Sequence, residues 1–370
     1  MNYKLKELSF HNKGFYGIGA SSCDYNEEYP QYLRITDIDD FGFAPSTLPT
    51  SINPNEYPDW NKYILKENDL LFARTGNSTG RNYLYRHSTK PTVFAGFLIK
   101  FSINPDLILP RYVGYYCQSD HYWNQIRSLF TGSTRANVNA EQYGELQIHV
   151  QSKVIQQHIV NTIGSVDDLI ENYQSQILSL FNYGLLLINQ LNESNELTNL
   201  SAIAKLEKGI EVGSSVYLDH KTDESIKYIR VGDLLSEGST YIPQDESKNE
   251  ALEYDILIAF DGAPGRNAIG LSGSFSSGIY KIGCDNKDKG LVYFELNSKI
   301  NQKIISDHSQ GTTILHASKA IPHLVSVLVD SEELLKLNSI FYRLVYLKAA
   351  VRKLRSNKEL LLDKYFTNQQ

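Results

Sequence analysis

The chain has 370 residues, 41% of them hydrophobic, which is enough for two domains that each bury a core of their own. Its three cysteines, Cys23, Cys117 and Cys284, are far apart and odd in number, which argues against a disulfide framework and a cysteine-based zinc site. The net charge of −6 is not the positive excess of a strong autonomous nucleic-acid binder, and no apolar stretch approaches the roughly 18 residues of a membrane-spanning helix. We therefore expect a cytoplasmic protein without a membrane partner.

The N-terminal part of the chain predicts a domain that mixes short strands with helices. Apolar runs predict strands, and a glycine-bearing loop follows the first of them. A second glycine turn comes after a helical stretch. This mixture indicates an α+β domain rather than a wound parallel sheet. The expected strands are 69–73 and 92–101, the helical stretch is 111–130, and the two loops are RTGNSTGRN at 74–82 and TGSTRAN at 131–137.

These two loops are the candidate binding site of the first domain. Gly76 and Gly80 have three residues between them and Arg81 follows, so the pattern of a nucleotide-binding P-loop fails. Glycines, small hydroxyl side chains and arginine can still bring donors to a nucleic-acid phosphate or base edge. Tight turns, hydroxyl caps and internal ion pairs of the arginines are the open alternatives. The candidate residues are Arg74, Thr75, Asn77, Ser78, Thr79, Arg81, Asn82, Thr134, Arg135 and Asn137.

A long amphipathic helix is predicted after the first domain, from about 154 to 192. Its apolar positions alternate steps of four and three residues over about ten positions, which is a heptad seam. Gly184 is the one small residue on this seam and predicts a close approach or a bend. The seam residues that we single out are Ile163, Val166, Ile170, Tyr173, Ile177, Leu180 and Leu187.

The same pattern then occurs a second time. YLRITDID at Tyr32, DLLFARTGNSTGRN at Asp69 and TGSTRANV at Thr131 return as YIRVGDLL, DILIAFDGAPGRN and GTTILHASKA, in the same order with loops of different length. A repeat of this length is a duplicated domain, not a solenoid unit. The matching candidates in the second copy are Arg230, Arg266, Asn267, Thr312, Thr313 and His316, with the same structural alternatives open.

A second long helix ends the chain. Its seam again alternates three and four residues, and Lys358 is its one polar position, either setting the register or extending along the helix to solvent. Residues 151–199 carry a net charge of −4 and residues 330–370 one of +3, which favours an antiparallel pair within one chain over a homodimeric coiled coil. The seam residues singled out are Leu337, Leu344, Leu347, Val351 and Leu354.

The predicted organisation is two similar α+β domains separated by two long antiparallel helices. The limits are 1–150 and 199–329 for the domains and 151–198 and 330–370 for the helices. The sequence shows no cofactor-binding glycine loop, no histidine pair for a metal and no motif of a methyltransferase or nuclease. We therefore expect neither catalytic nor metal-binding residues, and a chain that recognises a ligand rather than transforming one.

The duplicated loops, with the long helix after each copy, resemble the specificity subunit of type I restriction–modification systems over nearly the whole chain. The resemblance implies two target-recognition domains that read the two halves of a split sequence in double-stranded DNA. It implies two methyltransferase subunits as partners, which use S-adenosylmethionine to methylate adenine. A restriction subunit that uses ATP and Mg²⁺ completes the set, and no cofactor is implied for this chain. Because the loops differ, RTG in one copy and DG in the other, the two halves are expected to differ.

Two alternatives accompany this interpretation. The chain could be the reading subunit of a related restriction system in which one protein both cuts and methylates. It could also be a coiled-coil scaffold with two ligand-binding heads and no role on DNA. An enzyme with unrecognised chemistry is the least favoured hypothesis.

Overall fold

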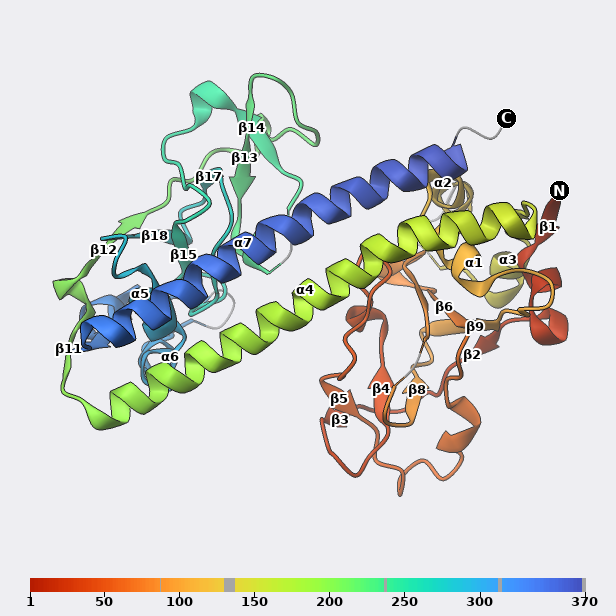
Figure 1. The fold of residues 1–370 in the computed structure, drawn as a ribbon, viewed down its shortest axis with the longest axis horizontal. Helices are drawn as coiled ribbons and strands as arrows, with labels where there is room; N and C mark the ends of the chain where they lie inside the picture. Colours follow the sequence, from red (N-terminus) through yellow and green to blue (C-terminus); the bar gives the residue numbers. More distant parts are fainter. Residues whose placement is uncertain (87, 130–136, 236–237, 312–314, 368–370) are drawn as a thin grey trace. The chain divides into compact units, whose positions relative to one another are not determined.

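The computed structural model describes residues 1–86, 88–129, 137–235, 238–311 and 315–367 (Figure 1). The chain divides into two compact units. Unit 1 combines Met1–Leu169 with Leu354–Gln370, and unit 2 is Ile170–Lys353. Each unit therefore holds one globular part and sections of both long helices. The limits given above for the domains remain predictions.

The described residues of unit 1 form three small sheets and three short α-helices beside the sections of the long helices. In the main sheet all neighbouring strands are antiparallel, whereas the second sheet contains one parallel pair, β4 with β8. The main sheet has the order β2(Phe15–Tyr16)-β9(Leu98–Ser102)-β6(Asp69–Ala73)-β7(Asn82–Leu84), the second β3(Cys23–Asp24)-β5(Thr50–Ser51)-β4(Gln31–Leu33)-β8(Thr92–Phe94), and β1(Asn2–Lys4) pairs with β10(Gln147–His149); the helices are α1(Pro110–Tyr116), α2(Asp120–Ser128) and α3(Ala140–Gly144).

The position of β6 inside the sheet explains why the run DLLFA is apolar at four of its five positions. All five of its residues are buried, because both faces of the sheet are covered. Phe72 on one face belongs to the larger core, where its ring stacks on that of Tyr143 with centroids 4.7 Å apart. Leu71 on the other face packs in a second cluster with Leu33. The predicted strand at 69–73 is thereby confirmed.

Unit 2 repeats this plan. It again has a main antiparallel sheet, a second sheet with one parallel pair, and a terminal two-stranded ribbon. The main order is β12(Ala204–Lys208)-β18(Ile279–Cys284)-β15(Ile256–Ala259)-β16(Asn267–Ala268), the second β14(Tyr241–Pro243)-β13(Ser225–Ile229)-β17(Ser274–Phe275), and β11(Leu197–Asn199) pairs with β19(Val325–Val327); the helices are α5(Lys289–Asn297) and α6(Lys299–Asp307).

The duplication is therefore one of topology and not only of short motifs. The four strands of each main sheet occupy matching places, with the strand that precedes the glycine loop next to the centre. In each second sheet, one strand carries the tyrosine of the Tyr-x-Arg sequence. This strand forms the parallel pair with a later strand of the same unit. An α+β fold with two similar globular parts, as predicted, accounts for this arrangement.

The two long helices are α4, Lys153–Ser194, and α7, Ser331–Leu362, and a short turn at Asp363–Thr367 follows α7. At 1.5 Å per residue, the 42 residues of α4 span about 60 Å. None of the predicted seam positions is exposed. Ile163, Ile170, Leu337, Leu344, Leu347 and Val351 are buried, and Val166, Tyr173, Ile177, Leu180, Leu187 and Leu354 are half-buried.

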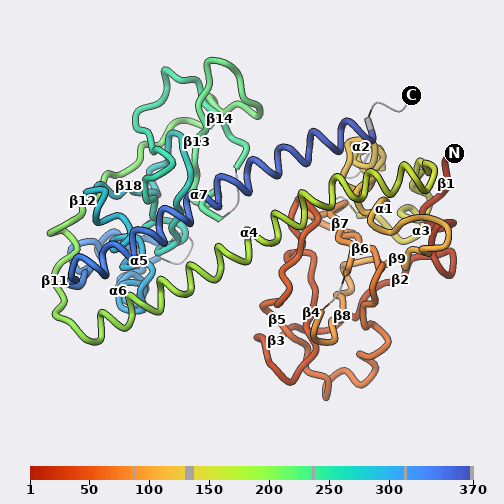
Figure 2. The backbone as a smooth tube through the Cα atoms, in the orientation of Figure 1, coloured from red at the N-terminus to blue at the C-terminus, as the bar shows by residue number. Residues whose placement is uncertain are grey.

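Within unit 1, the start of α4 lies along the end of the last helical segment. Nε2 of His158 is 3.1 Å from the hydroxyl of Tyr365, and Oδ1 of Asp167 is 2.8 Å from Nζ of Lys358. Residue numbers rise along one segment as they fall along the other, so the two run antiparallel in this unit. Unit 1 therefore combines the two ends of the chain, strand β1 and the end of α7, which Figure 2 draws in red and in blue.

Two predicted elements are divided in the structure: the expected strand 92–101 forms two strands, β8 and β9, and the expected helical stretch 111–130 contains two helices, α1 and α2. The strand that carries Tyr32 is short, because β4 ends at Leu33 and a 3-10 turn occupies Ile35–Asp37. The cause is Asp37, whose Oδ2 accepts a hydrogen bond of 2.8 Å from the backbone amide of Arg34 and closes the turn. Among the described residues, no helix is both long and apolar enough to span a membrane.

Candidate nucleic-acid interface

The two glycine loops have the same backbone design. Each joins two antiparallel strands, β6 to β7 in unit 1 and β15 to β16 in unit 2. Both glycines of each loop have positive φ: 71° and 93° for Gly76 and Gly80, and 77° and 84° for Gly262 and Gly265. A side chain is disfavoured in this region, so the glycines serve the shape of the turn. This agrees with the tight-turn alternative for the glycines themselves.

Two buried tyrosines, Tyr122 on α2 and Tyr143 on α3, form hydrogen bonds with the backbone of the glycine loop of unit 1. The hydroxyl of Tyr143 donates to the carbonyl of Ala73 at 2.6 Å and accepts from the amide of Gly80 at 3.1 Å. The hydroxyl of Tyr122 donates to the carbonyl of Gly80 at 2.6 Å. Burial raises the pKa of Tyr143 and of Tyr122 well above the ordinary value, so both hydroxyls remain donors.

The second predicted turn of unit 1 lies beside the first. Thr75 and Asn137 form a backbone bridge, and the amide of Val138 donates to the carbonyl of Arg74 at 2.9 Å. Nη2 of Arg74 donates to Oδ1 of Asn137 at 3.3 Å, while the guanidinium lies 4.9 Å from the ring centroid of Tyr16. Two segments about 60 residues apart in sequence thus form one surface. Thr134 and Arg135 lie outside the described residues.

Unit 2 makes the same junction with other side chains. Asp261 and His316 form the backbone bridge, and the amide of Gly262 donates to the carbonyl of Leu315 at 2.8 Å. Nδ1 of His316 lies 2.7 Å from Oδ1 of Asp261. Asp261 takes the place of Thr75 and was not among the candidates. Thr312 and Thr313 lie outside the described residues.

A third loop joins each site, and it carries an arginine that the candidate set contains in only one copy. The backbone amide of Arg230 donates to Oδ2 of Asp233 at 2.8 Å, as that of Arg34 does to Asp37. In unit 1 the guanidinium of Arg34 also bonds Asp37, at 3.2 and 3.3 Å. The repeat YLRITDID against YIRVGDLL was the signal that pairs Arg34 with Arg230.

The arginine of each glycine loop connects it to this third loop. Nη1 of Arg81 donates to the carbonyl of Ile38 at 3.5 Å, and Nη1 of Arg266 donates to that of Val231 at 3.3 Å. Nε of Arg81 also pairs with Oδ1 of Asp40 at 2.6 Å. The internal ion pair that was one alternative for Arg81 therefore exists, while its side chain keeps 28% exposure.

Some candidates point inward. Asn82 is 4% exposed, and its Nδ2 donates to the carbonyl of Cys117 at 2.6 Å. Thr79 is buried, and its hydroxyl donates to the carbonyl of Gly76 at 2.8 Å. In unit 2, Nδ2 of Asn267 donates to Oδ1 of Asn297 at 2.9 Å. These side chains support the loops from within, whereas Asn77, Asn137, Arg230 and His316 are exposed and Arg74, Thr75, Ser78, Arg81 and Arg266 are half-exposed.

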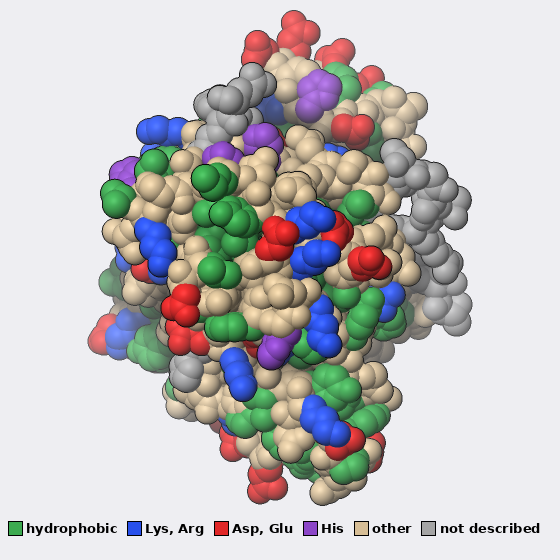
Figure 3. Space-filling view, turned by 90° about the vertical axis from the view of Figure 1, so that its right-hand side faces the viewer, with side chains coloured by type: hydrophobic (Ala, Val, Ile, Leu, Met, Phe, Trp, Pro, Cys, Tyr) green, Lys and Arg blue, Asp and Glu red, His purple; other side chains and the backbone are tan. Residues whose placement is uncertain are grey.

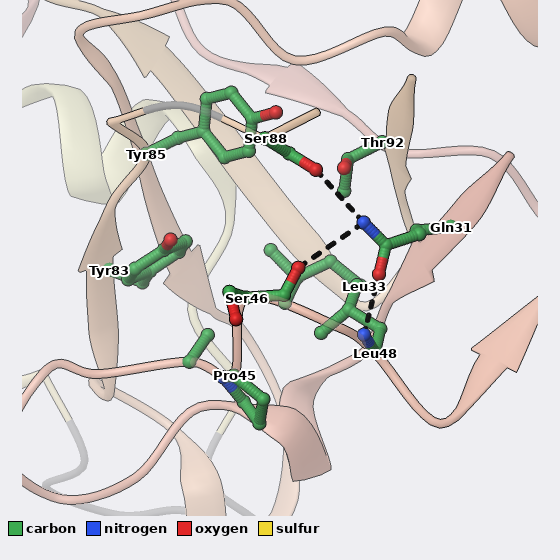
Figure 4. A pocket seen from close by; sticks show the side chains of 10 residues that line it. Gln31, Leu33, Pro45, Ser46, Leu48, Tyr83, Tyr85, Ser88 and Thr92 are labelled. Atoms are coloured by element: carbon green, nitrogen blue, oxygen red, sulfur yellow. Dashed lines mark hydrogen bonds between the residues drawn. The ribbon is translucent and has the colours of Figure 1, made fainter. Parts of the chain in front are cut away.

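A small pocket lies between the second sheet of unit 1 and the segment that precedes β5 (Figure 4). Nε2 of Gln31 donates to the hydroxyl of Ser88 at 2.9 Å and to the carbonyl of Ser46 at 3.4 Å, and Oε1 accepts from the amide of Leu48 at 2.6 Å. The side-chain amide of Gln31 therefore already has hydrogen-bond partners within the fold. Among the described residues, no three His, Cys, Asp or Glu side chains gather as metal ligands.

The N-terminal half of the chain is similar to a known family of domains. Residues 1–180 match the family model described as "Type I restriction modification DNA specificity domain". The match covers 180 of the 370 residues, just under half of the chain, and it holds for this N-terminal part. Comparison with curated proteins gives no match. The glycine loop, the Arg34 turn and the Asn137 junction of unit 1 all lie inside the matched specificity domain.

Comparison with solved structures finds two specificity subunits. The S subunit of a type I restriction–modification system from M. genitalium aligns with a TM-score of 0.54 at 16% identity, over 100% of this chain and 96% of that one. The HsdS subunit from Thermoanaerobacter tengcongensis aligns with a TM-score of 0.38 at 15% identity, over 100% and 97% of the two chains. The first likeness shows that the fold is shared.

Proposed function

We propose that this chain is the non-catalytic specificity subunit of a type I restriction–modification complex and reads a split DNA sequence. The observation that carries the proposal is a surface made by three loops: the glycine loop, the loop of Asn137 or His316, and the turn of Arg34 or Arg230. This three-loop surface occurs once in each unit on the same topology, with different side chains. In unit 1 the surface presents Arg34, Arg74 and Asn137, and in unit 2 it presents Arg230, Asp261 and His316. Two equivalent surfaces with different donors and acceptors suit two different half-sites.

The long helices support the bipartite part of the proposal. Residues of α4 and of α7 contribute to both units, so the helices connect the two reading surfaces. Two readers joined by regular helices recognise two short sequences and leave the DNA between them unread, as the half-site spacing of dimeric readers does.

The negative net charge of the chain is compatible with DNA binding if partner subunits supply positive charge. The net charge of −6 provides little phosphate affinity. On the face drawn in Figure 3, Lys and Arg side chains are interspersed with Asp, Glu and apolar ones rather than gathered in one patch. We infer that methyltransferase subunits, two per complex and carrying S-adenosylmethionine, supply further phosphate contacts. A restriction subunit that uses ATP and Mg²⁺ joins the same complex, and this chain binds neither cofactor.

The proposal is tested by methylation-aware sequencing of the source genome with and without this gene. The expected result is the loss of adenine methylation at one split motif, which also identifies both half-sites. If methylation persists at every motif while the partner genes are expressed, the proposed function is wrong and a scaffold without a role on DNA is favoured.

The equivalent arginines of the two copies offer a sharper test. In the assembled complex, Arg34→Ala is expected to weaken discrimination at one half-site and Arg230→Ala at the other, each by about tenfold. Duplexes with one half-site scrambled measure this in competition. Because each variant is the control of the other, a loss at the same half-site in both would contradict the assignment of one reader to each unit.

A further inference from the structure

A short acidic turn in unit 1, Asp39–Phe43, links the last long helix to the glycine loop. The turn closes on itself, because Oδ1 of Asp39 accepts from the amides of Phe41 and Phe43 at 2.9 Å each. The amide of Asp39 in turn donates to the carbonyl of Phe43 at 2.9 Å. Gly42 has a φ of 76°, and a Cβ there would lie 2.5 Å from Nε2 of Gln118. The turn is therefore held in one conformation by its own hydrogen bonds.

One side of the Asp39–Phe43 turn is held by α7. Nη2 of Arg355 is 3.3 Å from Oδ2 of Asp39, and its guanidinium lies 4.3 Å from the ring centroid of Phe41. Nζ of Lys358 lies 4.8 Å from the ring centroid of Phe43. The side chain of Arg355 is 21% exposed and that of Lys358 3%, whereas that of Asp39 is 38% exposed, so salt screens the Arg355–Asp39 pair only in part.

The other side of the turn holds the glycine loop. Oδ1 of Asp40 is 2.6 Å from Nε of Arg81, and the carbonyl of Ile38, just before the turn, accepts from Nη1 of the same guanidinium at 3.5 Å. Two acceptors on one short segment fix the direction of a planar guanidinium more firmly than a single partner does. Asp39 and Asp40 are neighbours in the chain, and they face different partners.

We propose that Arg355 is a positioning residue for the first reading site: α7 holds the Asp39–Phe43 turn, and the turn sets the direction of Arg81. The inference rests on the proposed reading of DNA by unit 1. It means that the C-terminal segment of the chain completes the reading site of the N-terminal domain. In unit 2, Arg266 bonds the carbonyl of Val231 and pairs with no carboxylate among the residues that the structure describes.

The test compares two arginines of α7 that both bond a carboxylate. Arg355→Met keeps an unbranched side chain but removes both the pair with Asp39 and the contact of the guanidinium with the ring of Phe41. Arg352→Met is the matched control, because Arg352 pairs with Glu253 of unit 2 at 2.7 Å, outside the three-loop surfaces. Discrimination between intact and scrambled half-sites is measured in the assembled complex, together with the thermal unfolding of each variant.

We expect Arg355→Met to reduce discrimination at the first half-site about tenfold, with the second half-site unchanged and Arg352→Met like the wild type at the first. Asp40→Asn, at a residue whose side chain is 71% exposed, is expected to give the same selective loss, and the double variant no further loss. Arg355→Lys, which retains the charge, is expected to recover part of the discrimination.

The outcomes separate this inference from the proposed function. A wild-type complex that discriminates no half-site contradicts the proposed function. A discriminating wild type together with an Arg355→Met variant that unfolds earlier but reads both half-sites normally leaves the function standing and overturns the positioning role. Additive losses from Asp40→Asn and Arg355→Met would also overturn it, because the two residues would then act separately.

Discussion

Nζ of Lys358 lies 2.8 Å from Oδ1 of Asp167, and each of these side chains is only 3% exposed. Of the two roles open for this polar position of the seam, extension to solvent is excluded by the burial. Burial lowers the pKa of Lys358, and the nearby carboxylate of Asp167 opposes the change. The pair joins the end of α7 to the start of α4 inside unit 1, at the polar position of the predicted seam.

Breaking this ion pair from one side is expected to destabilise unit 1 strongly. Lys358→Met leaves the carboxylate of Asp167 buried without its cation and should cost about 3–5 kcal/mol of unfolding free energy. The double variant Lys358→Met with Asp167→Leu removes both charges and should return to within about 1 kcal/mol of the wild type. Urea unfolding of the wild type, the single variant and the double variant measures these differences. Equal losses in the single and double variants would mean that the pair is not the source of the cost.

A buried carboxyl in unit 2 is expected to make stability depend on pH. Burial raises the pKa of Glu295 from 4.5 to about 7, against the hydrogen bonds that Asn192 donates at 3.0 Å and the Val327 amide at 2.8 Å. Between these pH values the folded chain keeps a proton that the unfolded chain loses. This group therefore lowers stability as the pH rises from 4.5 to 7, by roughly 3 kcal/mol in all.

The Glu295→Gln variant tests that contribution. A neutral amide can still accept from the Val327 amide, and its Nε2 can donate to Oδ1 of Asn192, a buried atom without a hydrogen-bond partner among the described residues. The variant is expected to be more stable than the wild type at pH 8 and equal to it near pH 4. Thermal unfolding across this range gives the difference. Parallel curves for the two proteins would show that Glu295 does not titrate in the window.

Regular, locally encoded features were the ones that the sequence could predict. The 3.5-residue period of α4 is carried by its own side chains over ten positions, and the buried strand β6 is apolar at four of its five positions. The matching order of motifs in the two copies predicted matching domains, because the same order of strands builds the same sheets. Even the small seam residue Gly184 was a correct signal of close packing, as described below.

What the sequence could not predict depends on partners far along the chain. Nothing near Asn82 indicates that the carbonyl of Cys117, 35 residues later, takes its amide and buries it. Asp40 resembles any acidic loop residue until the fold brings Arg81 to it, 41 residues away. Local composition thus locates the loops, whereas the division of their residues into exposed and supporting ones comes from tertiary contacts.

Gly184 of α4 is expected not to tolerate a side chain. An ideal Cβ at this position would lie 2.2 Å from Cζ of Phe294, whose ring is fully buried on α5. Gly184→Ala gains about 1 kcal/mol of helix propensity but should lose more through overpacking, for a net cost of about 1–2 kcal/mol. Adding Phe294→Leu should relieve the clash, so that the double variant is more stable than the sum of the single losses predicts. Additive losses in urea unfolding would contradict the close contact.

The two leucines of the predicted seam should respond unequally. Leu347 is fully buried, so Leu347→Ala is expected to cost about 2–5 kcal/mol. Leu180 is half-buried against the core of unit 2, and Leu180→Ala removes fewer contacts, with an expected cost of about 1–2 kcal/mol. Thermal unfolding measures both. If the helices also hold the reading sites together, methylation of the split motif should fall more in Leu347→Ala than in Leu180→Ala. Unchanged melting and methylation in both variants would show that the seam contributes neither to stability nor to reading.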